Sequence, residues 1–173
     1  WQNGCQAALM APTELLAQQH QRTMETLLAG TGLRVGLLVG SMTAAQKRDC
    51  RAALAAGALD LIVGTHALLS EGVSFRRLGL VITDEQHRFG VDQRAALAAK
   101  SGEKDRPHVL VMSATPIPRT LALMIYGDLD LSVIDQLPPG RTPVATYLIR
   151  EDKRARLYAF VRKQVAQGRQ VYI

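Results

Sequence analysis

The sequence is poor in cysteine and has no long apolar run. Its 173 residues include only two cysteines, Cys5 and Cys50, which lie far apart and outside any Cys-x-x-Cys pair. This spacing argues against a disulfide framework and against a zinc site. No stretch reaches the roughly 18 uninterrupted apolar residues of a membrane span, and the residues from Trp1 onward lack the basic start and apolar core of a signal peptide. We therefore expect a protein of the reducing cytoplasm.

Blocks of like charge are also absent, although the overall balance is basic. Lysine and arginine together number 21 against 15 acidic residues, a net charge of +6, and the pI is about 9.7. With 47% hydrophobic and 21% charged residues, the composition is typical of a globular domain with a core of its own. The lack of charge blocks argues against a disordered basic tail. The basic balance favours a polyanionic partner, nucleic acid first, and a solvated basic surface is the alternative.

Short apolar runs alternate with helical patterns along the whole chain, which predicts the α/β class with a parallel sheet. Strands are expected at 7–10, 33–39, 59–63, 78–83, 108–112, 129–134, 145–149 and 170–173, and helices at 14–28, 44–56, 93–100, 118–126 and 151–167. The segment 136–143 is rich in proline and glycine and predicts a linker between a first domain, 1–135, and the start of a second, 144–173. The sequence has no initiator methionine and ends in a strand-like pattern, so we expect a piece of a larger protein.

The expected strand at 78–83 is apolar on both faces and ends in two adjacent carboxylates, Asp84 and Glu85, followed by His87. Such a run predicts a buried parallel strand whose carboxyl end lies at the ligand-binding edge of an open sheet. There Asp84 could hold Mg²⁺, and Glu85 could orient or deprotonate an attacking water. His87 could sense the result by hydrogen bonding. The alternative is a strand that ends in a polar, solvated turn.

Four expected strands are followed by hydroxyl, glycine or carboxylate residues. These residues are Thr13, Gly64-Thr65-His66, Asp84-Glu85 and Ser113-Ala114-Thr115. In a parallel sheet these ends share one edge, where small residues let backbone N–H groups approach phosphates. Plainer roles stay open for each. Thr13, like Thr43, could only cap a helix; His66 could be a turn residue, and Ser113 and Thr115 could only satisfy a strand end.

Longer blocks resemble the motifs of superfamily 2 DNA helicases of the RecG type. They are Ala11-Pro-Thr-Glu-Leu-Leu-Ala-Gln-Gln-His20 for motif Ia, Val63-Gly-Thr-His-Ala-Leu68 for Ib, Asp84-Glu-Gln-His-Arg-Phe-Gly-Val91 for II and Ser113-Ala-Thr-Pro-Ile-Pro-Arg-Thr120 for III. The segment Asp128 to Thr142 resembles the connection to that family's second motor domain. The resemblance covers essentially the whole chain. It implies a truncated RecA-like parallel sheet flanked by helices, of the P-loop NTPase type, and the start of a second motor domain.

The resemblance also implies a role for each matching residue. Asp84 would bind Mg²⁺ on ATP, Glu85 would position the hydrolytic water, and His87 would couple hydrolysis to the grip on DNA together with Ser113, Ala114 and Thr115. DNA backbone contacts would come from Thr13, Gly64, Thr65 and His66, and from Gly40 and Ser41. The implied cofactors are ATP and Mg²⁺, and the implied partner is branched or forked DNA, bound by a monomer at the bacterial nucleoid with no membrane association. We assign Arg119 to a surface or phosphate-neighbour charge rather than a catalytic one, and Gln18, Gln19 and His20 to a solvated helix face.

The sequence departs from the family in having no Gly-Lys pair. The Gly-x-x-x-x-Gly-Lys-Ser/Thr loop that cradles phosphates is therefore not within these residues, and the resemblance places it just upstream of residue 1. Of the second motor domain, only 144–173 are expected here. We expect the parent protein to be an ATP-driven motor that remodels stalled forks and recombination intermediates in DNA repair. This piece alone is expected to be inactive and of marginal stability.

Two other interpretations stay open at this point. A transcription-repair coupling translocase resembles the chain at Asp84 to Val91 and Ser113 to Thr120, whereas Gly40-Ser41 and Pro138-Pro-Gly-Arg-Thr142 favour the RecG type. The other is a non-catalytic DNA-binding module that has kept a degenerate motor fold. A Gly-Lys-Thr immediately before Trp1 would distinguish the motor from the module.

Overall fold

The computed structural model describes residues 3–85, 97, 100, 106–114, 130–136, 138 and 140–173. The chain divides into two compact units, Trp1–Ile125 and Tyr126–Ile173, and each is considered by itself. The functional division at 1–135, 136–143 and 144–173 stays a prediction. Among the described residues, no helix is both long and apolar enough to cross a membrane.

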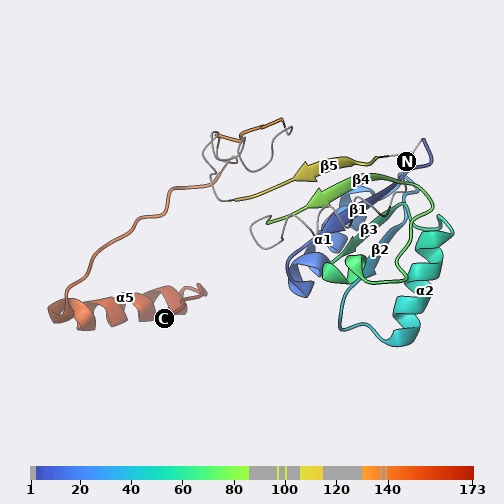
Figure 1. Cartoon of the computed structure of the whole chain (residues 1–173). Helices are drawn as coiled ribbons and strands as arrows, with labels where there is room; N and C mark the ends of the chain where they lie inside the picture. Colours follow the sequence, from blue (N-terminus) through green and yellow to red (C-terminus); the bar gives the residue numbers. More distant parts are fainter. Residues whose placement is uncertain are drawn as a thin grey trace. The chain divides into compact units, whose positions relative to one another are not determined.

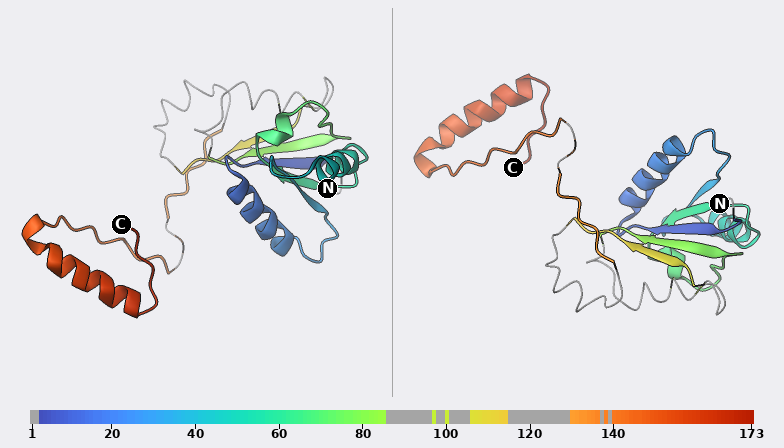
Figure 2. Two further views of the ribbon diagram at one scale, coloured as in Figure 1. Left: turned by 90° about the horizontal axis from the view of Figure 1, so that it is seen from below. Right: turned by 90° about the horizontal axis from the view of Figure 1, so that it is seen from above.

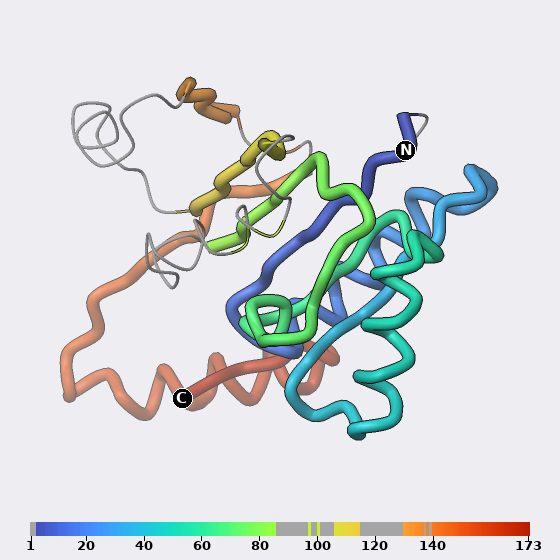
Figure 3. The backbone as a smooth tube through the Cα atoms, turned by 45° about the vertical axis from the view of Figure 1, so that its right-hand side comes forward, coloured from blue at the N-terminus to red at the C-terminus, as the bar shows by residue number. Residues whose placement is uncertain are grey.

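The first unit contains a sheet of five parallel strands in the order β2-β3-β1-β4-β5 (Figure 1). Its strands are β1 (Gln6–Met10), β2 (Val35–Leu38), β3 (Leu61–Gly64), β4 (Leu78–Thr83) and β5 (His108–Val111). All five were expected from the sequence, so the predicted α/β class and parallel sheet are confirmed. Figure 3 shows β4, in green, running beside β1, in blue, although the two strands are far apart in sequence.

Two helices follow β1 and β2, and hydroxyl caps start both of them. The helix α1 spans Glu14–Leu27, and the Thr13 side chain accepts a hydrogen bond from the Leu16 N–H at 3.3 Å. The helix α2 spans Ala44–Ala55, and Thr43 forms a reciprocal capping box with Gln46. Both predicted caps are confirmed, because each satisfies N–H groups that the first helical turn leaves unpaired.

The two faces of the sheet carry separate apolar cores. Strand residues alternate between the faces, so Leu9 and Val63 pack with Ala17 of α1, whereas Met10 and Ile62 pack on the other face. That second core also takes in Leu54 of α2, Ala67 and Leu68 of the short 3₁₀ helix η1 (His66–Leu69), and Leu97. Figure 2 shows α1 and η1 on opposite faces. The sequence analysis did not predict η1.

The strand β4 was expected to be buried on both faces, and this is only half correct. Leu78, Val81 and Thr83 are buried, but Leu80 and Ile82 are half-buried. The next strand, β5, ends the row of described strands and is more open still, with Leu110 48% exposed. The apolar side chains of both strands therefore keep surface that the described residues do not cover.

A buried glutamine at the start of β1 joins three segments. The Gln6 Nε2 group donates to the carbonyl oxygens of Leu54 and Leu59 at 2.9 and 2.7 Å. Its Oε1 atom accepts from the backbone N–H groups of Arg76 and Arg77 at 2.8 and 3.2 Å. Gln6 is only 5% exposed. Its side-chain amide therefore supplies buried hydrogen-bond partners to backbone groups at the end of α2, in the loop before β3 and in the loop before β4.

The second unit bears out one helix and none of the predicted strands. The expected helix at 151–167 is present as the 3₁₀ turn η4 (Glu151–Lys153) followed by α5 (Arg154–Ala166). The strands expected at 145–149 and 170–173, and at the described part of 129–134, are wrong, because these residues are irregular and mostly exposed. A strand needs a neighbour for its N–H and C=O groups, and the described part of this unit offers none. The helix expected at 118–126, and nearly all of that at 93–100, lie outside the described residues.

Gly64 ends β3 where a side chain has no room. An added Cβ would overlap the Leu38 carbonyl oxygen and lie 2.9 Å from Leu68 Cγ. We expect Gly64→Ala to lower the free energy of unfolding by about 1–3 kcal/mol, measured by urea denaturation followed by circular dichroism. Gly40→Ala is the matched control, because its Cβ would meet only the flexible end of Glu14. Equal stability of the two variants would contradict this packing role.

Candidate functional site

The last residues of the five strands form one row across the sheet. Leu38 of β2 pairs with Gly64 of β3, Gly64 with Met10 of β1, Met10 with Thr83 of β4, and Thr83 with Val111 of β5. The segments that follow these strands therefore start from a common edge. The geometric part of the sequence prediction, that the polar strand ends share one edge, is confirmed.

Backbone hydrogen bonds continue one step past this row. The Asp84 N–H donates to the Met10 carbonyl at 3.0 Å, and the Ala11 N–H donates to the Gly64 carbonyl at 2.8 Å. The Met112 N–H donates to the Thr83 carbonyl at 2.9 Å. These bonds hold the first residue beyond each strand, so the site begins on rigid backbone.

Asp84 lies against a histidine of α1. The Nε2 atom of His20 is 2.7 Å from Oδ2 of Asp84, and both side chains are mostly buried, 25% and 21% exposed. The other carboxylate oxygen of Asp84, Oδ1, accepts from the Glu85 N–H at 3.0 Å. The assignment of His20 to a solvated helix face is therefore wrong, because the turn of α1 that carries His20 faces the end of β4.

Glu85 has an unusual backbone conformation. Its φ angle of +50° is the only positive φ of a non-glycine residue among those the structure describes. This left-handed conformation is disfavoured for residues with a Cβ and is concentrated at functional sites. This conformation turns the chain immediately after Asp84, at the end of β4.

Glu14, in the first turn of α1, ties the loop after β2 to the site. Its Oε1 atom accepts from the Ser41 N–H at 2.9 Å, and Lys47 donates to the carbonyl oxygen of Gly40. Hydrogen bonds from Ser41 hold the pKa of the Glu14 carboxyl below its ordinary value, while desolvation opposes this. Because the pKa is lowered, the tie is present at neutral pH and is lost as the pH falls through the folded-state pKa. Gly40 and Ser41 are thus joined to the helix that Thr13 caps.

Thr65 and His66 follow β3 and differ in exposure. The Thr65 side chain is buried and accepts from the Ala67 N–H at 3.5 Å, which caps η1. His66 is exposed at the start of η1. Of the two, only His66 presents its side chain to solvent, because the Thr65 backbone also bonds internally: its N–H donates to the Leu38 carbonyl and its own carbonyl accepts from the Leu68 N–H.

Ser113 and Ala114 follow β5 and are exposed. They come two and three residues after Val111, which pairs with Thr83, so they leave the same edge as Asp84. The remaining predicted site residues, His87 and Thr115, and also Arg119, lie outside the described residues.

The carboxylate at this edge suits Mg²⁺ bound together with a nucleotide, and not a metal ion enclosed by protein side chains alone. Among the described residues, no group of three or more His, Cys, Asp or Glu side chains could enclose a metal ion. Mg²⁺ is commonly held by one or two carboxylates, with waters and substrate phosphates completing its octahedron. Asp84 offers such a carboxylate, partly exposed and oriented by hydrogen bonds at both oxygens.

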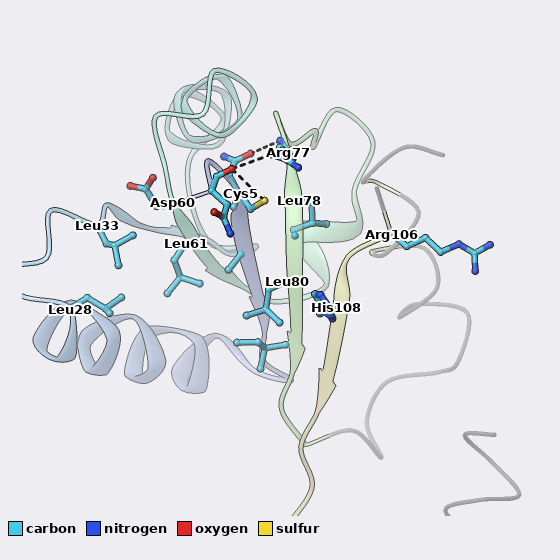
Figure 4. A pocket seen from close by; sticks show the side chains of 15 residues that line it. Cys5, Leu28, Leu33, Asp60, Leu61, Arg77, Leu78, Leu80, Arg106 and His108 are labelled. Carbon is cyan, nitrogen blue, oxygen red and sulfur yellow. Dashed lines mark hydrogen bonds between the residues drawn. The ribbon is translucent and has the colours of Figure 1, made fainter. Parts of the chain in front are cut away.

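A cavity of about 530 Å³ lies away from this edge. It is lined by the first residues of β1, β4 and β5, which are Gln6, Leu78 and His108. Figure 4 shows Leu61 of β3, Leu80 of β4 and Leu28 at the end of α1 around the same space. Ligands of open parallel sheets bind at the carboxyl ends of strands, so we do not assign the site to this cavity.

Sequence reasoning missed three residues that shape the site, namely His20, Glu14 and Lys47. His20 and Glu14 lie in the block that resembles motif Ia, so the signal was in the quoted motif. Six residues separate Glu14 from His20, which is about 1.7 helical turns, so the two side chains leave α1 on different sides and contact different segments, the loop after β2 and the end of β4. Nothing in the sequence pattern pairs Lys47 with Gly40.

Comparison with known proteins places these features in a family. The sequence model of the family described as DEAD/DEAH box helicase matches residues 1–124. The ATP-dependent DNA helicase RecG of Synechocystis sp. is 56% identical over 172 residues, which cover 99% of this chain and 20% of that protein. The RecG of Treponema pallidum is 50% identical over 175 residues, with 99% and 26% covered.

A solved structure of RecG bound to a three-way DNA junction is 45% identical, with a TM-score of 0.78 over 95% of this chain and 22% of that chain. The chain spans about a fifth to a quarter of the length of the curated relatives it matches. The predicted RecA-like fold and the resemblance to the RecG type are both confirmed. The chain belongs to the DEAD/DEAH box helicase family.

Proposed function

We propose that this chain is part of a RecG-like, ATP-dependent DNA helicase that unwinds or branch-migrates stalled forks and recombination intermediates during DNA repair. The observation that carries the proposal is the shared strand edge, where Asp84 and Glu85 directly follow Thr83, and Thr83 lies in one row with Met10 and Gly64 at the ends of β1 and β3. The similarity to RecG sequences supports RecG over the transcription-repair coupling translocase.

Each carboxylate has its own role at the nucleotide. Asp84 would hold Mg²⁺, and the ion would supply charge neutralisation at the phosphates of ATP. Glu85 would orient the attacking water and take up its proton. Ser113, Ala114 and Thr115, with His87, would sense the state of the nucleotide and pass it to the DNA-contacting segments.

The DNA-contacting residues form a second set at the same edge. Thr13, Gly64, Thr65 and His66, with Gly40 and Ser41, would contact the sugar-phosphate backbone. Such contacts position a protein on DNA without reading its sequence, which suits an enzyme that must step along any sequence. His66 offers an exposed side chain, whereas the Gly64 carbonyl and the Thr65 N–H already bond to Ala11 and Leu38, so Gly64 and Thr65 would contribute by letting the strand end approach the DNA closely.

The proposal includes the setting in which the protein acts. The similar RecG proteins are bacterial, so we place the native protein in the cytoplasm, at the nucleoid, as a monomer. The phosphate-cradling Gly-Lys-Ser/Thr loop is not among the 173 residues, so we propose that this chain by itself does not hydrolyse ATP.

The exposed His66 tests the DNA contact. In the native protein that contains this chain, His66→Ala is expected to raise the DNA concentration for half-maximal ATPase stimulation about fivefold, since one lost hydrogen bond costs about 1 kcal/mol. The rate at saturating DNA should stay unchanged. Ser70→Ala is the control, because Ser70 is also exposed and directly follows η1. An unchanged DNA requirement for His66→Ala would remove His66 from the DNA contact.

A further inference from the structure

We propose that His20 is a positioning residue for the magnesium site, one that fixes the Asp84 carboxylate and joins it to the DNA-contacting start of α1. This inference rests on the proposed function. It adds a residue that the motif comparison had left on a solvated helix face. It also makes α1 the element that connects the proposed DNA contact at Thr13 with the proposed magnesium site at Asp84.

The Asp84 carboxylate is held by hydrogen bonds at both of its oxygens. A carboxylate turns easily about its last torsion angle, which has broad minima. Here Oδ2 accepts from the His20 Nε2–H at 2.7 Å and Oδ1 accepts from the Glu85 N–H at 3.0 Å. Both oxygens are therefore fixed, and each keeps a lone pair for a metal ion or its bound water. Groups that hydrogen-bond a ligating carboxylate in this way orient it and tune its affinity.

His20 reaches Asp84 from a different element of the fold. It is 64 residues before Asp84 in sequence and belongs to α1, whereas Asp84 follows β4. The Asp84 backbone is bound separately, to Met10 of β1. The imidazole is thus a side-chain link between a helix and the end of a strand, and any shift of α1 along or about its axis moves the hydrogen-bond donor of Asp84.

The start of the same helix carries groups of the proposed DNA contact. Thr13 caps α1 and is a proposed DNA contact, and Glu14 in the first turn holds Ser41 at 2.9 Å. His20 lies about two turns further along, or roughly 10 Å, a distance over which a helix is rigid. DNA that docks at Thr13 and Ser41 therefore acts on the same rigid element that positions Asp84.

Three substitutions of His20 test whether the position of its N–H donor matters, or only the packing of its side chain. His20→Gln can place an amide N–H near the position of Nε2, whereas His20→Asn places it near Nδ1 and falls short of Asp84. His20→Ala removes the donor altogether. Gln19→Ala, one residue away and exposed, is the matched control on the same helix.

The readout is equilibrium binding of a fluorescent ADP to the native protein, titrated with Mg²⁺ in the absence of turnover. The Mg²⁺ midpoint is expected to rise about 10- to 100-fold in His20→Ala and His20→Asn, the range seen when such partners of metal ligands are lost. It should stay near wild type in His20→Gln and Gln19→Ala. Binding of ADP without Mg²⁺ should be the same in all variants. If His20→Ala does not fold, the comparison of Gln with Asn decides.

Two results would overturn the inference. One is a Mg²⁺ midpoint that His20→Ala and His20→Asn leave unchanged in a protein whose wild type shows magnesium-dependent binding. The other is an equal rise in the Gln and Asn variants, which would mean that only the shape of the imidazole matters. A wild-type protein that neither binds ADP nor hydrolyses ATP would instead fail the proposed function, and the inference would fall with it.

Discussion

Replacing Glu85 by glutamine in the native protein is expected to lower the DNA-stimulated rate of ATP hydrolysis by about 10²- to 10⁴-fold, the usual contribution of a positioned general base. Glutamine keeps the shape of the side chain but cannot accept a proton from water. Binding of magnesium and ADP should be nearly unchanged, because Asp84 and its hydrogen bonds to His20 and the residue-85 N–H stay in place. The measurement is a steady-state ATPase assay with saturating DNA.

Glu71→Gln is the matched control for this change. Glu71 is an exposed carboxylate in the loop between η1 and β4, so the same loss of charge there should leave the rate unchanged. A Glu85→Gln enzyme that retains more than about a tenth of wild-type activity would exclude Glu85 as the base. Loss of ADP binding in that variant would show instead that residue 85 acts through the fold, since its backbone has a strained positive φ.

Gln6→Leu is expected to lower the free energy of unfolding by about 3 kcal/mol or more. Leucine has a similar volume but removes the partner of the Leu59 carbonyl oxygen and of the Arg76 and Arg77 N–H groups, while the Leu54 carbonyl keeps its bond from the Gly57 N–H. Each buried group left unpaired costs about 1–3 kcal/mol, and the N–H groups of the exposed residues Arg76 and Arg77 contribute at the low end of this range. Urea denaturation followed by circular dichroism gives the value.

The same change at an exposed position serves as the reference. Gln19→Leu on α1 replaces an exposed amide and is expected to alter the unfolding free energy by about 0.5 kcal/mol or less. If Gln6→Leu were as stable as Gln19→Leu, the network of Gln6 would contribute no net stability. Apolar burial would then be sufficient to hold β1 against its neighbouring loops.

Local patterns were enough to predict most of the first unit. Apolar runs gave the five strands, and Thr13 and Thr43 gave the starts of two helices, because capping depends on residues only three positions apart. The shared edge of the strand ends followed from parallel pairing alone. The same reasoning failed for the strands expected in the second unit, where apolar runs lack a neighbouring strand among the described residues.

Contacts between residues far apart in the sequence could not be predicted from local patterns. His20 pairs with Asp84 across 64 residues, and Gln6 joins segments that lie 48 to 71 residues away. Such pairs depend on which strand lies beside which, since β1 sits between β3 and β4. Without the strand order, a polar residue on a helix or strand is expected to face solvent. The roles of Gln6 and His20 therefore became clear only from the structure.

ATP hydrolysis by the native protein that contains this chain, measured with and without three-way junction DNA, tests most directly whether the fold works as a motor. We predict magnesium-dependent hydrolysis that junction DNA stimulates, and no hydrolysis by the 173-residue chain alone. A native protein that binds the junction with strong salt dependence but hydrolyses no ATP under any of these conditions would contradict the account. It would show that the fold serves as a DNA-binding module.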